Sequence, residues 1–487
     1  MKNPAAPPRR GVFCIMPLMR AQRLFVLSAL VLSVAARAGA EEAYGYRVGV
    51  NGAYLSNLRQ ETIRRWVKGT GAAMPRVGMR MDLFQKGMPD HPDAFVSDAA
   101  AVPGGGALAM LFNESQDVTR PDGTKDSGCK PPQGLWEPVF DNGSDEPGPG
   151  AKVNPRNEWA VFVAAMGERY DGDGVDDARG SPGVMYFSVW NEPDWVAWPN
   201  RPKKDDRTLR NWFGRSTADL ARLAFVSYRA AKFANPKAKV GVQLCFNETL
   251  GYLLDDAKHP LAKSCDFIDF HAYGGKTGDD NCFRNDGIVP VWRQMKGEYD
   301  KRKLPPPQFL CSETGVGGGP AGSEKGRTQA AAVIKANVVG ASLGLVTTCW
   351  YALVDPSWEN MGLIADASKL PPDGEGAEFL DAYTAMAHVA KLLPPTTVFV
   401  REHRSQEDAH AYEFRDREGK AVWVCWLDDS STNSQPRPIS PPMKPGEWMR
   451  FDFEENPAKE WHSVTVRGTD TESINVTKTP VFYRQVK

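Results

Sequence analysis

Carboxylates follow several apolar runs of this sequence, and the clearest case is VMYFSVWNEPDW, residues 184–195. An aromatic, strand-like run ends directly on Asn191 and Glu192, and Pro193 comes next. Proline fixes its own φ and biases the preceding residue towards extended geometry, so this turn should aim the Glu192 side chain reproducibly. A second carboxylate, Glu313, lies near the end of the run QFLCSET. Paired strand-end carboxylates are the groups that general acid and nucleophilic chemistry requires.

Eight short apolar runs separate helical patterns and must position these residues. Between them, Leu220, Leu223, Ala224, Ser227 and Ala231 share one face of a helix expected after Ser216 and Thr217. Alternation of this kind predicts parallel strands in a closed (β/α)8 TIM barrel over residues 41–393. An open doubly wound sheet is the alternative, but VGVNGAY lacks its glycine-rich phosphate turn. The runs are 46–50, 76–84, 107–113, 184–190, 239–246, 267–273, 308–314 and 345–354.

From Pro394 the pattern changes to short alternating strands such as HAYEFRD and AVWVCWLDD, with turn signals such as DREGK between them. This pattern predicts a small all-β domain, sandwich-like, over residues 394–487. Long insertions rich in Gly and Asp follow the third run (113–155) and the sixth run (274–289). Both should lie on the barrel face that carries the carboxyl ends of the strands.

Residues 1–40 are typical of a secretory signal peptide. They hold six basic residues and no acidic one, followed by the apolar run LFVLSALVLSVAA and the small residues ARAGA. The apolar run has about thirteen residues, which is too short to span a bilayer comfortably, so a membrane anchor is the weaker reading. We therefore expect cleavage near Ala38 or Ala40, and a secreted or periplasmic protein with no membrane partner after cleavage.

Composition and charge limit the classes of binding partner that we expect. The sequence is 41% hydrophobic and 24% charged, as in ordinary globular proteins. Without residues 1–40, 53 basic residues face 60 acidic ones, and no basic cluster stands out, so nucleic acid is not an expected partner. Cys129 and Cys282 lie in the two long insertions, where an exported protein could join them in a disulfide; free thiols are the alternative.

The side chains at strand ends should converge on one site, because the carboxyl ends of barrel strands share one face. A ring of this kind, rich in carboxylates, amides and aromatic groups, suits a sugar, whose glycosidic bond is cleaved by one carboxylic acid and one carboxylate. Glu114, Glu192 and Glu248 each follow an Asn and compete for the acid role, with Glu192 favoured by its aromatic strand and Pro193. The ring comprises Asn51, Asp82, Asn113, Glu114, Asn191, Glu192, Asn247, Glu248, His271, Tyr273, Glu313 and Trp350.

The motifs VWNEPD, FHAY and CSETG resemble those at strands four, six and seven of the clan A glycoside hydrolases, which are retaining (β/α)8 enzymes. WNEPD, GMRMD and the extra β domain are most similar to glycoside hydrolase family 39 and its relatives. The resemblance implies that Glu192 is the acid/base and Glu313 the nucleophile. It also implies a cis peptide after Trp350, and these further roles: Asn191 holds the substrate 2-hydroxyl, Tyr273 touches the nucleophile, His271 lines the pocket, Arg80 pairs with Glu313, and Trp350 floors the sugar site.

This assignment carries physical expectations. Two carboxyl groups about 5–5.5 Å apart would allow direct attack and a covalent glycosyl-enzyme. Their mutual repulsion should raise the pKa of one, so that Glu192 stays protonated while Arg80 favours ionised Glu313. Trp195, Trp198 and Trp358 are candidates for stacking on sugar faces, with simple packing as the alternative.

The expected function is therefore a secreted retaining glycosidase, β-xylosidase-like or a related glycanase, acting on a polysaccharide or oligosaccharide by double displacement. A non-catalytic carbohydrate-binding protein on the same barrel is the main alternative. A metal-dependent hydrolase is less favoured, because His271 alone among the histidines lies at a strand end.

No cofactor is expected, with one reservation. The stretch YDGDGVDDARG (170–180) matches part of a calcium-loop pattern, with Asp171, Asp173 and Asp176 as oxygen donors. No Glu follows at the spacing of an EF-hand, so a plain turn is favoured over structural calcium.

Overall fold

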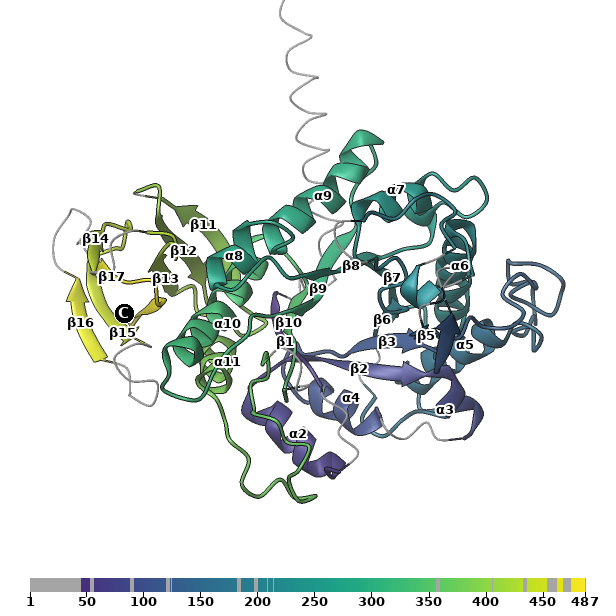
Figure 1. Cartoon of the computed structure of the whole chain (residues 1–487), viewed down its shortest axis with the longest axis horizontal. Helices are drawn as coiled ribbons and strands as arrows, with labels where there is room; N and C mark the ends of the chain where they lie inside the picture. The colour runs from purple at the N-terminus through teal and green to yellow at the C-terminus, as the bar shows by residue number, and fades with distance from the viewer. Residues whose placement is uncertain are drawn as a thin grey trace, which may run out of the picture. The chain divides into compact units, whose positions relative to one another are not determined.

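Eight parallel strands close into a barrel, and each of the eight predicted apolar runs contains one of them (Figure 1). Nearly every strand residue is buried, as expected for parallel strands that are covered on both faces. Each strand bonds to the next, and the last to the first, in the order β1 (Arg47–Asn51), β2 (Met74–Arg80), β3 (Leu108–Phe112), β6 (Tyr186–Val189), β7 (Lys239–Leu244), β8 (Phe267–Ala272), β9 (Gln308–Thr314) and β10 (Thr347–Trp350).

The computed structural model describes most of residues 45–486, which form one compact unit. The expected signal peptide, residues 1–40, lies outside the described residues. Among the residues that are described, no helix is both long and apolar enough to cross a bilayer. Within 45–486 the description leaves out 53–56, 88–91, 120–122, 124, 182–184, 197–199, 208, 213, 356–359, 405, 432–435, 453–461 and 467–473.

Helices surround the barrel and cover the outer faces of the strands. The predicted helix after Ser216 is confirmed as α6, and it begins with a capping box in which Ser216 and Asp219 satisfy each other's backbone N–H groups. Its predicted apolar face is buried. The helices are α2 (Gln60–Gly69), α3 (Met81–Gln85), α4 (Asp93–Ala100), α5 (Glu158–Arg169), α6 (Thr217–Ala234), α7 (Asn247–Leu254), α8 (Gly278–Phe283), α9 (Ile288–Lys301), α10 (Glu324–Ser342) and α11 (Asp381–Leu392).

The barrel interior is filled at the end where the strands begin. A buried apolar cluster includes Met74, Leu108, Phe267 and Leu310, each at or near the start of its strand. Packing of this kind closes one end of the barrel, so a ligand site has to lie at the carboxyl ends of the strands.

The C-terminal part is all-β, as predicted. Side chains alternate along its main sheet: Ala411, Trp423 and Cys425 pack in a separate core with the two-stranded sheet, whereas Tyr412 and Val424 join the barrel core. The main sheet has the order β11 (Val398–His403), β12 (Ala409–Arg415), β13 (Ala421–Leu427), β18 (Val481–Gln485), β15 (Gly446–Asp452) and β16 (His462–Val466), and the small sheet pairs β14 (Arg437–Ile439) with β17 (Ile474–Val476).

A buried ion cluster joins the β domain to the barrel. Lys335 of α10 is completely buried, and its Nζ lies 2.9 Å from Asp279 of α8 and 2.8 Å from Asp429, which follows β13. A lysine charge is expensive to bury unless it is paired, so the cluster holds these three elements together.

Two local predictions were wrong. The run 76–84 is not one strand, because β2 ends at Arg80 and α3 begins at Met81, which places Asp82 on a helix. The insertion after β3 is not all loop, since β4 (Ser115–Thr119) and β5 (Lys125–Cys129) form a hairpin. The considered Cys129–Cys282 disulfide is absent, because both thiols are free and Cys282 is buried in α8.

Candidate active site

Glu192 lies in a strained turn directly after β6. Trp190 and Glu192 have φ values of +68° and +47°, in the left-handed region that is unfavourable for side chains other than glycine. The turn is held from β7, where the Gln243 side chain accepts the Glu192 backbone N–H. Asp194 accepts the backbone N–H groups of Cys245 at 2.9 Å and Phe246 at 3.0 Å. The backbone thus directs the Glu192 carboxylate inward at a conformational cost that these bonds offset.

Glu313 reaches the same site from the end of β9. The register between β8 and β9 shifts between Phe270 and His271, an irregularity of the kind that redirects side chains beside active sites. The Tyr273 hydroxyl donates to Glu313 Oε2 at 3.0 Å, which confirms the expected contact between Tyr273 and this carboxylate. A buried guanidinium bonds to the other oxygen, Oε1.

That guanidinium belongs to Arg76, and the expectation that Arg80 pairs with Glu313 was wrong. Arg80 instead donates twice to Asp82, at 2.8 Å each, and its side chain is 40% exposed. The two arginines are four residues apart on β2, about 13 Å along an extended strand, so Arg80 lies beyond the site at the rim. Arg76 is buried, and its Nη2 also donates to Asn191 Oδ1 at 2.8 Å.

His271 lies between the two carboxylates. Its Nδ1 is 2.7 Å from Glu192 Oε1 and 3.3 Å from Glu313 Oε2, so these two oxygens are at most about 6 Å apart, the sum of the two distances. Its Nε2 lies 3.1 Å from the Ser312 hydroxyl, which fixes the orientation of the ring. The imidazole therefore joins the two acids that the sequence singled out.

The pKa shifts of this group run against the expectation that repulsion between the two acids raises the pKa of Glu192. Burial by itself lowers the pKa of His271, but the charges of Glu313 and Glu192 outweigh burial and raise the pKa. Burial raises the pKa of Glu192, yet the hydrogen bond and charge of His271 and the charge of Arg76 bring the pKa below its ordinary value. Both shifts favour a charged pair, in which His271 Nδ1 and Glu192 Oε1 lie 2.7 Å apart. The sequence placed His271 in the pocket but did not indicate its contact with both acids.

The aromatic residues expected at the site differ in their placement. Trp195 is half-buried and lies in the turn that begins with Glu192. Its backbone N–H donates to the Glu192 carbonyl oxygen at 3.2 Å. Trp350 has no exposed surface, and its indole donates to Met361 O at 2.9 Å, so its ring does not floor an open sugar site. The half-buried aromatic side chain here is Tyr351, and the cis peptide is Tyr351–Ala352, one residue later than predicted. Trp198 and Trp358 lie outside the described residues.

The rival acids make other contacts. Glu114 lies 3.5 Å from Lys130, and Glu248 is in the first turn of α7. The group around Glu192 and Glu313 instead includes Arg76, Gln243 and Ser312, which sequence reasoning missed. The available signal was a polar residue inside a buried apolar run, as in VGVQL and RVGMRMD.

A cavity of about 610 Å³ adjoins this group. Tyr273 lines it together with Gly315 and Gly318, from the glycine-rich segment that follows Glu313, and with Asn360 and Met361. Its volume lies within the range of small-molecule sites, and Tyr273 connects it to the carboxylates.

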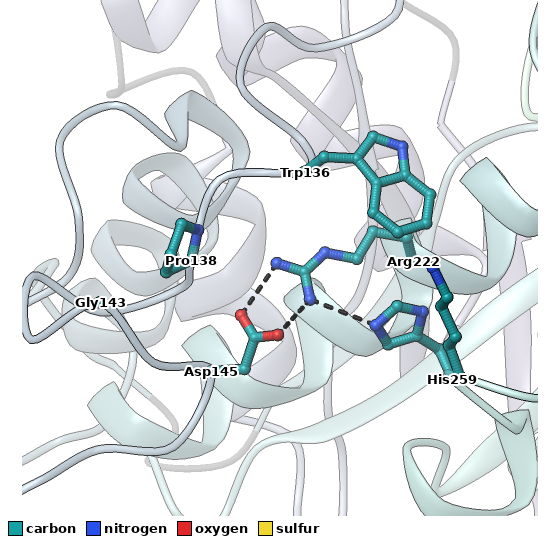
Figure 2. A pocket seen from close by; sticks show the side chains of 7 residues that line it. Trp136, Pro138, Gly143, Asp145, Arg222 and His259 are labelled. Atoms are coloured by element: carbon teal, nitrogen blue, oxygen red, sulfur yellow. Dashed lines mark hydrogen bonds and ion pairs between the residues drawn. The ribbon is translucent and has the colours of Figure 1, made fainter.

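A second cavity, of about 260 Å³, lies on the outside of α6 (Figure 2). Arg222 of α6 donates to Asp145 at 2.6 and 2.9 Å, and its Nη1 is 3.3 Å from His259. The half-exposed Trp136 borders the same cavity, and its indole donates to Asp219. Arg222 thereby fixes the long insertion after β3 to the barrel wall.

The acidic loop 170–180 satisfies its own carboxylates. Asp171 and Asp173 accept the backbone N–H groups of Asp173 and Val175 at 3.1 and 2.8 Å. Carboxylate oxygens of Glu168, Asp171 and Asp173 lie within 4.8 Å of one another, whereas Asp176 is not in that group. A plain turn explains these bonds, and structural calcium remains a prediction.

Comparison with known proteins adds the class of fold: the chain has the fold of clan A glycoside hydrolases. It is similar to a family 39 glycoside hydrolase from Bacteroides cellulosilyticus WH2, with a TM-score of 0.57 and 15% identity over 91% of this chain and 82% of that one. A family 30 endoxylanase from Clostridium papyrosolvens C71 gives a TM-score of 0.55 and 12% identity over 91% and 96%. A monomeric β-xylosidase from Caulobacter crescentus CB15 gives 0.51 and 14% over 91% and 96%. The sequence itself matches no family model and no curated protein.

Proposed function

We propose that this protein is a retaining glycoside hydrolase that cleaves a polysaccharide or oligosaccharide by double displacement. The observation that carries the proposal is the short distance between Glu192 and Glu313. Glu192 Oε1 and Glu313 Oε2, which both contact His271 Nδ1, are at most about 6 Å apart. Inverting enzymes need room for a water, with carboxyl groups about 6.5–9.5 Å apart, whereas retaining enzymes have about 5–5.5 Å. The fold shared with family 39 and family 30 enzymes supports the same assignment.

In the first step, Glu313 attacks the anomeric carbon while the bond to the leaving oxygen breaks. Arg76 and Tyr273 each bond to one oxygen of Glu313, which orients the carboxylate. The leaving oxygen takes a proton from Glu192, which is supplied with it by the imidazolium at 2.7 Å. The product is a glycosyl ester of Glu313 and a free leaving group.

In the second step, a water attacks the anomeric carbon of the ester and loses its proton to Glu192. The Glu313 ester bond breaks, and the sugar leaves with its original configuration. Asn191, fixed by its bond from Arg76, is placed beside Glu192 to hold a substrate hydroxyl. The cavity beside Tyr273 is the proposed place for the sugar.

The substrate class is proposed from the neighbours and from the chemistry of the site. Structures of the same fold include a β-xylosidase, the endo-β1,6-glucanase BT3312 and a glucosidase from Croceicoccus marinus. We therefore place β-xylosides and β-glucosides first among the candidate substrates.

Export is part of the proposal. Its support is the basic flank, the apolar run 24–36 and the small residues before Glu41. N-terminal sequencing of the protein made in a bacterial host with a secretion pathway tests it: a start at residue 39 or 41 in the exported fraction supports export, and an intact N-terminus in the cytoplasm contradicts it.

The enzymatic proposal is tested with glutamine variants of the two proposed catalytic glutamates and of the two rival glutamates. Glu313→Gln should abolish hydrolysis of every aryl glycoside that the wild type cleaves. Glu192→Gln should lose activity on poor leaving groups but keep the kcat/KM of dinitrophenyl glycosides, whose departure needs no acid, with a lower kcat because the second step loses its base. The matched controls Glu114→Gln and Glu248→Gln, which also follow an Asn, should behave like the wild type. Sugar binding without hydrolysis in the wild type would instead indicate a carbohydrate-binding protein.

A further inference from the structure

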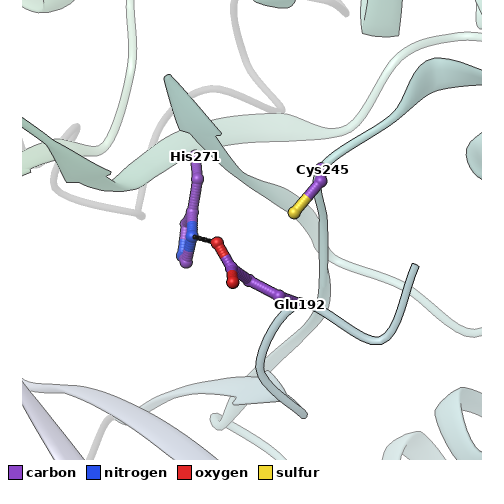
Figure 3. Close-up of side chains that lie close together, drawn as sticks. All are labelled: Glu192, Cys245 and His271. Carbon is purple, nitrogen blue, oxygen red and sulfur yellow. Dashed lines mark hydrogen bonds and ion pairs between the residues drawn. The ribbon is translucent and has the colours of Figure 1, made fainter. Parts of the chain in front are cut away.

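Three potential metal ligands converge at the acid/base. Glu192 follows β6, Cys245 follows β7 and His271 lies on β8, three neighbouring strands whose ends lie side by side (Figure 3). A carboxylate oxygen, the thiol sulfur and an imidazole nitrogen all lie within 4.8 Å of one another. The oxygen and nitrogen are already 2.7 Å apart in a hydrogen bond. The proposed mechanism uses the acid and the imidazole but gives the thiol no task.

We propose that Glu192, Cys245 and His271 form a binding site for Zn²⁺ or a cation of similar softness, and that this cation inhibits the enzyme. Zn²⁺ accepts thiolate, imidazole and carboxylate ligands together, and three protein ligands leave its fourth position open. Ca²⁺ and Mg²⁺ prefer sites made of oxygen alone, so the sulfur and nitrogen select against them. The binding site stands on geometry, whereas the inhibition rests on the proposed function.

The imidazole is already oriented for a metal. Its Nε2 is 3.1 Å from the Ser312 hydroxyl, which leaves Nδ1 facing Glu192 and Cys245. Metal-bound histidines commonly use the second ring nitrogen in such a bond, which fixes the orientation of the ring. With metal–ligand bonds of about 2.0–2.3 Å, ligand atoms in a tetrahedral zinc site are about 3.3–3.8 Å apart. The oxygen and nitrogen, now 2.7 Å apart, would therefore separate by about 0.6 Å. The sulfur, which lies within 4.8 Å of both, would approach them by about 1 Å at most.

The local charge also favours a cation. Glu313 lies 3.3 Å from the same imidazole nitrogen, so two carboxylates face this point. The Arg76 guanidinium is itself bonded to Glu313 and Asn191. The cation would take the place of the proton between Glu192 and His271. A Glu192 carboxylate that is bound to the metal cannot protonate a leaving group, and the open coordination position faces the substrate.

Calorimetry of the full chain with ZnCl₂ tests the site without reference to activity, and Co²⁺ serves as a spectroscopic probe. We expect one bound cation per chain and a cobalt complex with thiolate charge-transfer absorption. Cys245→Ser should remove that absorption and weaken Zn²⁺ binding by more than the roughly 10–100-fold that an outer-shell substitution costs. Cys245→Ala serves as a second variant for the same loss. The matched control is Cys265→Ser, at a thiol that bonds to Phe267 O outside the cluster, which should bind like the wild type.

Unchanged Zn²⁺ binding in both Cys245 variants, or a cobalt spectrum without thiolate absorption, would overturn the site. Inhibition of the wild type by Zn²⁺, competitive with the aryl glycoside and weaker in Cys245→Ser, would support its regulatory role. The two proposals fail separately: binding without any hydrolase activity removes the proposed function and keeps the site, and hydrolysis without Zn²⁺ binding does the reverse.

Discussion

Replacing Arg76 with methionine tests the electrostatics of the site, and Arg80→Met is the matched control on the same strand. Arg76 is 3% exposed and pairs with a carboxylate that is 12% exposed, so removing its charge leaves Glu313 without its cation. Breaking a buried pair in this way costs about 3–5 kcal/mol of the free energy of unfolding. At about 2.1 cal/mol/K per residue, the roughly 450 residues that follow the expected signal peptide lose about 1 °C of Tm per kcal/mol, which gives a fall of about 3–5 °C.

The effect on catalysis follows from the lost bond to Glu313. A hydrogen bond to a charged group contributes about 1.5–3 kcal/mol, so kcat/KM should fall about 10- to 150-fold in Arg76→Met. Arg80 is 40% exposed in its pair with Asp82, and such pairs contribute about 0–1 kcal/mol, so Arg80→Met should change Tm by about 1 °C at most. Calorimetric melts and steady-state kinetics on one aryl glycoside measure both. A wild-type kcat/KM in Arg76→Met would refute this account of the site. So would an Arg80→Met whose kcat/KM falls as far as that of Arg76→Met.

Three further predictions use the same kinetic and unfolding assays. Tyr273→Phe removes one O–H bond to the nucleophile and should lower kcat/KM about tenfold, with Tm nearly unchanged, whereas full activity would show that the bond is dispensable. Lys335→Met leaves the buried Asp279 and the part-buried Asp429 without their cation and should cost about 3–5 kcal/mol in urea unfolding, and a cost below about 1 kcal/mol would contradict the role of the cluster. Burial raises the pKa of Asp194 to about 6, so the folded state binds more protons than the unfolded state below that pH, and stability should fall by about 2 kcal/mol between pH 4.5 and 7. Asp194→Asn should lose this fall, and an unchanged pH profile of unfolding would contradict the assignment.

The barrel could be predicted because each of its strands is a buried apolar run with polar residues at its end. Glu192 and Glu313 were identified for the same reason, since a strand end in a barrel is also a place in the site. The capping residues of α6 were equally local signals. The geometry of the turn was not predicted, because Pro193 suggested an extended Glu192 and its φ is +47°.

The errors concern offsets and tertiary partners. Side chains alternate along a strand, so the one-residue difference between Trp350 and Tyr351 decides which ring is buried and which is half-exposed. The choice of Arg80 over Arg76 was an error of position along β2, which ends earlier than its apolar run suggests. The lowered pKa of Glu192 depends on His271, which comes from another strand and lies 2.7 Å from Glu192, and no local pattern contains that distance.

The most direct test of the central claim is the anomeric configuration of the glycosyl azides that Glu192→Ala and Glu313→Ala form when azide replaces the missing carboxylate. With a dinitrophenyl glycoside, Glu192→Ala still forms the Glu313 ester, and azide then displaces it, so NMR should show an azide with the configuration of the substrate. Glu313→Ala has no nucleophile, so azide attacks the substrate directly and the product should be inverted. The same configuration from both variants, or azide products from neither, would contradict the assignment of Glu192 as acid/base and Glu313 as nucleophile.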